Sequence, residues 1–293
     1  MRVVANGIGI EVDDQGAPGG EPVLLIMGLG MQLTGWPDEL VQDLVGRGFR
    51  VIRLDNRDAG LSQYFDEAGT PNLALAALRY SLRLPLSPAY RLQDMAADSL
   101  GVLDALGIAQ AHVCGASMGG MIAQHLAIRH PTRVKSLTLI MTTTGDRKLP
   151  QPRLKVRGAL MSRPSGQNPD AVVEHLKRLF SLIGSPAYPT DAARLQQRLQ
   201  ASVARAWHPA GTARQLAAVV ADGNRSVLVQ NLRLPTQVIH GEADPLVPVA
   251  AGRQLVRLIP GAQADFIPGM GHDLPAQLLP RIARTIADNA RRR

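Results

Sequence analysis

Residues 111–120 read AHVCGASMGG and place Ser117 between two glycines, directly after a short apolar run. A helical pattern, MIAQHLAIRHP, follows the serine and stops at Pro131. A serine on a sharp turn between a buried strand and a helix is held up at the carboxyl end of the sheet, where its hydroxyl can act as a nucleophile. Gly115 and Gly119 suit such a turn because side chains there would clash with the tight strand-to-helix approach. The stretch predicts a nucleophile only if the rest of the chain supplies the sheet.

Other short apolar runs along the chain predict that sheet. They lack strict alternation, as expected for strands covered on both faces. These runs are residues 22–27, 49–54, 111–115, 134–141, 236–241 and 262–269. Helical patterns lie between them at residues 36–48, 94–107 and 121–131. A turn at Asn6-Gly7 also predicts an N-terminal hairpin. Strands that alternate with helices indicate an α/β fold with a mostly parallel, doubly wound sheet.

One segment interrupts the alternation. Residues 145–232 contain no convincing core strand, and proline-rich joints separate several helical patches within them. The segment is too regularly patterned for a disordered linker. We therefore expect a helical cap at residues 145–232, inserted into a core domain formed by residues 1–144 and 233–293.

Composition excludes several classes of protein. The chain has 293 residues, of which 45% are hydrophobic, enough to bury a substantial core. Its first residues lack the apolar stretch of a signal peptide, and no window approaches the roughly 18 apolar residues of a membrane span. Cys114 is the only cysteine, which excludes an intrachain disulfide and a cysteine-based metal site. We expect a cytoplasmic protein in which Cys114 is a buried strand residue.

The net charge of +8 suggests a nucleic-acid-binding protein at first sight. Residues 146–230 carry thirteen Lys and Arg against five Asp and Glu, an excess equal to the whole net charge. The arginines among them are scattered singly, with almost no aromatic residues between them. The pattern favours a solvated basic surface, and we expect no nucleic-acid partner.

A nucleophilic serine needs a general base, and the base needs an acid that orients it. His272 lies in the glycine-rich loop FIPGMGHDLP after the last predicted strand, at the edge where Ser117 is expected. Asp244 follows another strand in GEADPLVP, and the chain order Ser, Asp, His is the one expected in this architecture. Glu242 is the alternative acid. The remaining histidines are interpreted as structural or, for the two in the inserted segment, as substrate contacts at most: His112, His125, His130, His175, His208 and His240.

The candidate site also needs backbone donors for an oxyanion. Met118 begins the helix after Ser117, so its N–H points toward an oxyanion above the serine. A second donor is expected from the loop IMGLGMQ, where Gly28 and Gly30 allow close backbone approach. We assign this donor to the N–H of Leu29, with a plain glycine turn as the alternative.

Four motifs together resemble the α/β-hydrolase superfamily: GASMGG around the serine, HGEADPLVP, GMGHDLP, and LDNRDAGLS at residues 54–62. With LIMGLGMQLTGWPDEL added, the sequence is similar to the aclacinomycin methylesterase type, which are carboxylic ester hydrolases with a helical cap. The resemblance implies the following site residues: the nucleophile Ser117, the acid Asp244, the base His272, and the oxyanion amides of Met118 and Leu29.

The chain departs from the superfamily pattern in its oxyanion loop. Many members carry histidine before the first glycine of that loop, whereas Met27 occupies the position here. The charged cluster at residues 55–58 corresponds to a turn that is structural in the family. The inserted segment matches no family motif, so the resemblance implies no particular substrate.

We expect ester hydrolysis through an acyl-enzyme, with a small-molecule ester as substrate and without a metal or organic cofactor. The same triad could instead cleave a thioester, lactone, amide or carbon–carbon bond, or act as a cofactor-free perhydrolase. A dehalogenase or epoxide hydrolase is disfavoured because those enzymes need a carboxylate nucleophile where this chain has Ser117. A ligand-binding protein on the same scaffold is the non-enzymatic alternative, although such proteins typically lack a triad member.

Overall fold

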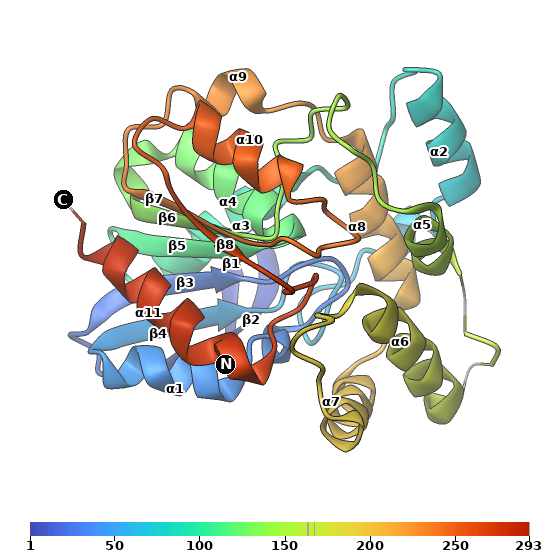
Figure 1. Ribbon diagram of the computed structural model, residues 1–293, viewed down its shortest axis with the longest axis horizontal. Coiled ribbons are helices and arrows are strands. Elements are labelled where there is room, and N and C mark those ends of the chain that lie inside the picture. Colours follow the sequence, from blue (N-terminus) through green and yellow to red (C-terminus); the bar gives the residue numbers. More distant parts are fainter. Residues whose placement is uncertain (163, 167, 293) are drawn as a thin grey trace.

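A single sheet forms the centre of the computed structural model, which describes residues 1–162, 164–166 and 168–292 (Figure 1). Within those residues eight strands follow the order β1-β2-β4-β3-β5-β6-β7-β8. Strand β2 is antiparallel to both of its neighbours, and the other neighbouring pairs are parallel. The strands are β1 (Arg2–Ala5), β2 (Ile8–Gln15), β3 (Glu21–Ile26), β4 (Phe49–Leu54), β5 (Ala111–Ala116), β6 (Val134–Ile140), β7 (Thr236–Gly241) and β8 (Gln263–Ile267). The predicted α/β fold with a mostly parallel sheet is confirmed.

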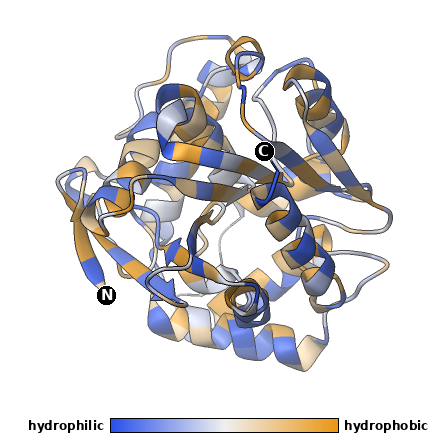
Figure 2. Cartoon of the chain, turned by 90° about the vertical axis from the view of Figure 1, so that its left-hand side faces the viewer, coloured by the Kyte–Doolittle hydropathy of each residue, from blue (hydrophilic) through white to orange (hydrophobic). Residues whose placement is uncertain are grey.

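Helices cover both faces of this sheet (Figure 1). One face packs against α1 (Asp38–Gly46) and α11 (Leu279–Ala290), and the other against α3 (Leu92–Ala105), α4 (Met118–Arg129) and α10 (Ala250–Leu258). In β3, Leu25 packs with the first group and Leu24 with the second, and neither is exposed. Burial on both faces explains why the strands read as apolar runs. Polar and apolar residues alternate along the surrounding helices (Figure 2).

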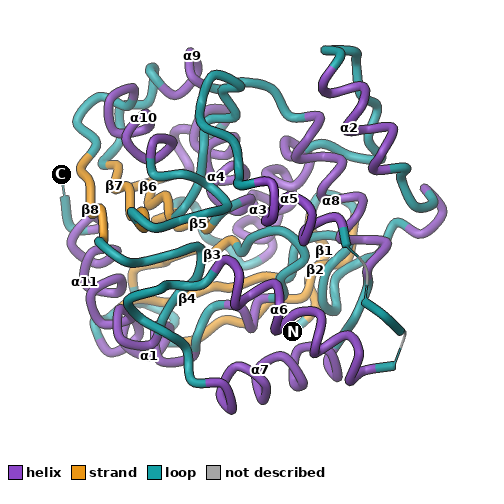
Figure 3. The backbone as a smooth tube through the Cα atoms, turned by 45° about the vertical axis from the view of Figure 1, so that its right-hand side comes forward, coloured by secondary structure: helices purple, strands orange, loops and turns teal. Residues whose placement is uncertain are grey.

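The connection from β6 to β7 is helical. Its described residues form α5 (Leu154–Met161), α6 (Pro169–Ile183), α7 (Ala192–Arg205), α8 (Pro209–Ala221) and α9 (Ser226–Val229), without a strand. Side-chain caps begin two of these helices: Asn168 accepts the Ala171 N–H at 2.8 Å, and Asp191 accepts the Arg194 N–H at 2.9 Å. Helices α6 and α7 lie side by side (Figure 3) and share a small apolar cluster.

Helix α8 packs against the core of the molecule. Its buried face includes Gly211, Arg214, Gln215 and Ala218, and Ala218 belongs to the apolar core that also contains residues of α3 and α4. Helix α2 (Leu73–Ser81), from the connection between β4 and α3, packs beside α8 (Figure 1). Short 3-10 helices complete the described elements: Leu33–Gly35, Asp66–Ala68, Pro131–Arg133 and Ala276–Leu278. None of the described helices has the length and apolar character needed to cross a membrane.

Candidate active site

Ser117 occupies a strained turn between β5 and α4. Its backbone φ of 55° and ψ of −120° are unusual for a residue with a side chain. A Cβ on Gly115 would lie 2.2 Å from the Gly119 carbonyl oxygen, and a Cβ on Gly119 would lie 2.0 Å from the Ile26 carbonyl oxygen. Both glycines are therefore required by steric contacts. The Ser117 N–H donates to the Ile140 carbonyl at 2.9 Å, which ties the turn to the end of β6.

Three loops at the carboxyl edge bring the predicted triad residues together. His272, in the loop after β8, has Nε2 3.0 Å from Ser117 Oγ and Nδ1 2.7 Å from Asp244 Oδ2. Asp244, in the loop after β7, also accepts the N–H groups of Leu246 and Val247 on Oδ1, both at 2.8 Å. Asp244 and His272 are buried. The carboxylate is thus fixed on one oxygen and free to hold the imidazole with the other.

The alternative acid Glu242 and the neighbouring carboxylate Asp273 face other partners. Glu242 pairs with Arg253 at 3.0 Å on the surface. Asp273 follows His272 directly, but its carboxylate accepts a hydrogen bond from the Ser185 hydroxyl. Burial raises the pKa of Asp273, although the Ser185 hydrogen bond opposes this shift. Neither carboxylate is hydrogen-bonded to the His272 ring, whereas Asp244 is.

Two further histidines sit in local structural contacts. His112 Nδ1 lies 2.8 Å from the Ser136 hydroxyl, between neighbouring strands. His125 Nε2 lies 2.9 Å from Asp222 Oδ1, and burial with nearby Arg225 lowers its pKa to about 3. Burial also lowers the pKa of His112. Both side chains hold secondary-structure elements together, and a pKa of about 3 keeps His125 neutral at ordinary pH.

His240 lies beside the candidate acid, a contact that its sequence position did not indicate. Its Nε2 is 3.6 Å from Asp244 Oδ2 and donates to the Val247 carbonyl at 2.8 Å. Burial lowers the pKa of His240. Its Nδ1 has no hydrogen-bond partner among the described residues. A neutral His240 therefore packs against the acid loop without competing for the proton on His272.

The loop after β3 approaches Ser117 closely. A Cβ on Gly28 would lie 3.2 Å from the Ser117 Cβ. Within the described part of the chain, the N–H groups of Leu29 and Met118 make no hydrogen bond, while the N–H of Gly30 donates to Gln215 Oε1 at 2.8 Å. Both predicted donors are thus unpaired backbone groups, and Met118 is in addition at the positive end of α4.

The turn after β4 supports this loop. The Asn56 side chain donates to the Met27 carbonyl at 2.9 Å, and Asp55 Oδ1 accepts the Leu33 N–H at 2.6 Å. Asp58 is held by Arg214 at 2.8 and 2.7 Å. Burial acts to raise the pKa of Asp58, but the hydrogen bonds, chiefly from Arg214, bring it below its usual value. The charged cluster at residues 55–58 thus has a structural role, and Asn56 anchors the loop that carries Met27.

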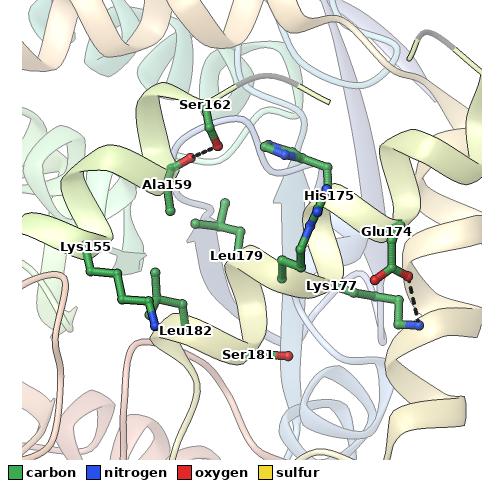
Figure 4. A pocket seen from close by; sticks show the side chains of 10 residues that line it. Lys155, Ala159, Ser162, Glu174, His175, Lys177, Leu179, Ser181 and Leu182 are labelled. Atoms are coloured by element: carbon green, nitrogen blue, oxygen red, sulfur yellow. Dashed lines mark hydrogen bonds and ion pairs between the residues drawn. The ribbon is translucent and has the colours of Figure 1, made fainter. Parts of the chain in front are cut away.

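Two hollows lie in or beside the helical connection, and neither is lined by the five predicted site residues. A hollow of about 730 Å³ between α5 and α6 is flanked by basic side chains and by Glu174, which pairs with Lys177 at 3.3 Å (Figure 4). Another of about 440 Å³ adjoins the acid and histidine loops and includes Arg198 and Asp273. No group of three or more metal-binding side chains occurs among the residues that the structure describes.

The sequence of the chain matches a known protein family. A family model described as alpha/beta hydrolase fold matches residues 21–276. The chain belongs to the α/β-hydrolase family. The matched residues include the strand–turn–helix at Ser117, called the nucleophile elbow, the two loops that carry Asp244 and His272, and the whole helical connection. Membership and the relatives below identify the chain as a hydrolase.

The similar proteins include a methylesterase and a hydrolase of a dienedioate. Rhodomycin D methylesterase from Streptomyces peucetius is 28% identical over 299 residues, covering 94% of this chain and 93% of that protein. A 2-hydroxy-6-oxononadienedioate/2-hydroxy-6-oxononatrienedioate hydrolase from Cupriavidus pinatubonensis is 31% identical over 274 residues, covering 90% of this α/β hydrolase and 84% of the relative. The expected similarity to methylesterases is confirmed.

Solved structures agree on the fold. A meta-cleavage product hydrolase from Pseudomonas fluorescens matches with a TM-score of 0.75 at 21% identity, covering 99% of this chain and 96% of that one. The esterase RhEst1 from a Rhodococcus species matches with a TM-score of 0.71 at 22% identity, covering 98% and 97%. At this identity the likeness supports the α/β-hydrolase fold alone.

Proposed function

We propose that this α/β hydrolase cleaves carboxylic esters of small molecules through an acyl-enzyme on Ser117. The observation that carries the proposal is the continuous hydrogen-bonded chain from Ser117 Oγ to His272 at 3.0 Å and from His272 to Asp244 at 2.7 Å. Such a chain lets an imidazole remove the hydroxyl proton while a carboxylate fixes the tautomer. The methylesterase relatives favour an ester as the bond that is cleaved.

In the acylation step, Ser117 Oγ attacks the ester carbonyl carbon and His272 Nε2 takes the hydroxyl proton. Asp244 Oδ2 accepts the hydrogen bond from Nδ1–H and stabilises the imidazolium that forms. The carbonyl oxygen, now negative, accepts hydrogen bonds from the backbone N–H groups of Leu29 and Met118. Each such donor contributes about 10²–10³ in kcat in comparable sites.

Collapse of the tetrahedral intermediate expels the alcohol, which takes its proton from His272. A water molecule then attacks the acyl-enzyme and gives a proton to His272. When this second tetrahedral intermediate collapses, His272 passes the proton to Ser117 Oγ, and the carboxylic acid is released. Apart from the ester and one water molecule, the groups that this proposed cycle uses are side chains and backbone amides of the chain itself.

The helical segment at residues 145–232 is proposed as the cap that selects the substrate. The His272 backbone N–H donates to the Ile183 carbonyl at 2.7 Å, so the end of α6 contacts the loop of the base. Arg205, at the end of α7, pairs with Asp55 at 2.8 Å beside the oxyanion loop. Because these contacts surround the carboxyl edge, we propose that the cap sets the size and charge of the acyl and alcohol groups admitted.

Carbon–carbon bond hydrolysis with the same triad is the second candidate. The relative from Cupriavidus pinatubonensis supports it, because its named substrates are diacids with a 2-hydroxy-6-oxo diene rather than esters. The elbow and the oxyanion donors fit either reaction, since both pass through an oxyanion derived from a carbonyl group. The two candidates differ in the substrate that is turned over.

Hydrolysis of p-nitrophenyl esters from acetyl to dodecanoyl, by the wild type and by Ser117→Ala, tests the proposal. We expect the variant to lose about 10⁶ in kcat, the scale known for removal of a triad serine. Ester turnover that survives in Ser117→Ala would contradict the assignment of the nucleophile.

A parallel assay with 2-hydroxy-6-oxononadienedioate distinguishes the second candidate. If the wild-type protein hydrolyses none of the esters but cleaves this diacid, it is a carbon–carbon bond hydrolase. A wild type that turns over neither and does not react with a fluorophosphonate at Ser117 is a ligand-binding protein on the hydrolase scaffold.

A further inference from the structure

Gln215 joins the helical connection to the loop that carries the proposed oxyanion donor. It lies on α8 and its side chain is completely buried. Its Oε1 accepts the Gly30 N–H at 2.8 Å, and its Nε2 donates to the Arg57 carbonyl at 2.7 Å. Both ends of one amide are therefore used to connect the loop after β3 with the turn after β4.

The loop around Leu29 needs such an anchor because glycines flank this residue on both sides. Glycine tolerates many backbone conformations, and Gly30 has a φ of 66°. On one side of Leu29, the Met27 carbonyl is held by Asn56 at 2.9 Å. On the other side, Gln215 holds the Gly30 N–H. The two hydrogen bonds lie on either side of the Gly28–Leu29 peptide unit, which carries the proposed oxyanion donor.

Other contacts with the helical connection hold the same loop from outside. A Cβ on Gly30 would lie 2.8 Å from the Thr212 methyl carbon, so α8 touches the loop backbone directly. The Gln32 side chain donates to the carbonyls of Ser202 and Ala206 at 2.7 and 2.8 Å. These contacts fix the position of the loop, whereas the Gln215 hydrogen bond fixes the orientation of a peptide group next to Leu29.

We propose that Gln215 is a positioning residue for the oxyanion hole, acting through Gly30 to aim the Leu29 N–H at the reacting carbonyl oxygen. The inference rests on the proposed function, because it assumes that Ser117 is the nucleophile. By accepting the Gly30 N–H, Gln215 also removes that group as a competing donor. A preorganised donor costs no rearrangement when charge develops in the transition state, which is why its orientation matters for the rate.

Gln215→Met tests this role, since methionine approximates the volume of glutamine without its hydrogen bonds. Gln254→Met is the matched control. Gln254 is also a buried helical glutamine, and its side chain accepts from the Thr144 hydroxyl at 2.6 Å and donates to Asp146 at 2.8 Å. Both variants remove two side-chain hydrogen bonds, but only Gln215→Met releases the oxyanion loop. A third variant, Gln215→Glu, keeps an oxygen that can accept the Gly30 N–H.

The readouts are kcat and KM for a p-nitrophenyl ester and the second-order rate constant for fluorophosphonate labelling of Ser117. Labelling places a phosphoryl oxygen in the oxyanion hole and does not depend on the natural substrate. For Gln215→Met we expect both kcat and the labelling rate to fall by about 10–100-fold, less than the 10²–10³ for outright loss of a donor, with KM little changed. We expect Gln254→Met to stay near wild type and Gln215→Glu to recover part of the loss.

The outcomes separate this inference from the proposed function. If the wild type is labelled but hydrolyses no ester, the ester proposal fails while the labelling rates still test Gln215. Equal labelling of Gln215→Met and wild type overturns the inference. An equal loss in both methionine variants also overturns it, because the effect is then a general consequence of destabilisation. If Gln215→Met does not fold, the fluorophosphonate labelling rate of Gln215→Glu is the test of the inference. Labelling of Ser117 in that variant that is no faster than labelling of an ordinary surface serine overturns the inference. A wild type that is not labelled at all overturns both.

Discussion

The Asp244→Asn variant isolates the role of one carboxylate oxygen. In the wild type, Oδ1 accepts the N–H groups of Leu246 and Val247 at 2.8 Å, and Oδ2 lies 2.7 Å from His272 Nδ1. Asparagine keeps the first oxygen and so preserves the loop. Its amide nitrogen then faces Nδ1, which forces the neutral imidazole to carry its proton on Nε2. In that tautomer His272 cannot accept the proton of Ser117.

The size of the effect follows from this geometry. A wrong tautomer costs about 10⁴ in kcat in triads of this kind, which corresponds to about 5.4 kcal/mol of activation free energy. His240 offers no substitute, because its Nε2 already donates to the Val247 carbonyl at 2.8 Å and burial lowers its pKa. Since the hydrogen bonds to Oδ1 remain, we expect the free energy of unfolding to fall by less than about 1 kcal/mol. The Tm should therefore fall by less than about 4 °C.

The assay measures kcat for the best p-nitrophenyl ester together with thermal unfolding of the same preparations. Glu242→Gln is the control, because Glu242 pairs with Arg253 on the surface at 3.0 Å and should leave kcat unchanged. The reasoning is refuted if Asp244→Asn keeps more than about one hundredth of the wild-type kcat while Glu242→Gln loses it, since Glu242 would then be the acid. A large fall in the Tm of Asp244→Asn would instead show that the loop hydrogen bonds were not preserved.

Two further predictions concern the scaffold of the site. Gly119→Ala is expected to destabilise the protein by about 1–3 kcal/mol or more, because the new Cβ would lie 2.0 Å from the Ile26 carbonyl oxygen; thermal unfolding measures this, and Gly158→Ala, where a Cβ meets nothing within 4 Å, should not destabilise. Arg214→Met is expected to cost about 3–5 kcal/mol at neutral pH, because the buried Asp58 carboxylate loses its guanidinium partner and keeps the neutral donors Phe65 N–H and Tyr90 hydroxyl. In the folded wild type the pKa of Asp58 is lowered. The ionised Asp58 carboxylate therefore contributes fully to the free energy of unfolding above the unfolded-state pKa of about 3.9, and this contribution is lost as pH falls through the lower folded-state pKa. Unfolding measured from pH 7 to pH 2 should show the gap between wild type and variant narrowing in that acid range, and a gap independent of pH would contradict the assignment.

The sequence by itself determined the fold and predicted the elbow. Six of the strands, β3 to β8, were visible as apolar runs, because burial on both faces makes neighbouring residues such as Leu24 and Leu25 apolar, and the hairpin of β1 and β2 was indicated by the turn at Asn6-Gly7. The glycines around Ser117 were visible because their contacts depend on residues close in the chain or on a recurrent strand–helix crossing. His272 and Asp244 could be predicted as candidates because parallel strands all end at one edge, which brings their following loops together.

Only the tertiary structure decided how the oxyanion loop is held. The partner of the Gly30 N–H is Gln215, 185 positions away on a helix of the connection whose pattern matched no motif. The Met27 carbonyl is held by Asn56, and His240 lies against the acid loop. Most buried polar groups are paired, and any donor or acceptor that packing brings within reach can pair them. The spacing of apolar residues and the positions that only glycine can occupy are therefore determined by short stretches of sequence. The identity of a buried hydrogen-bond partner depends instead on how elements distant in the sequence pack together.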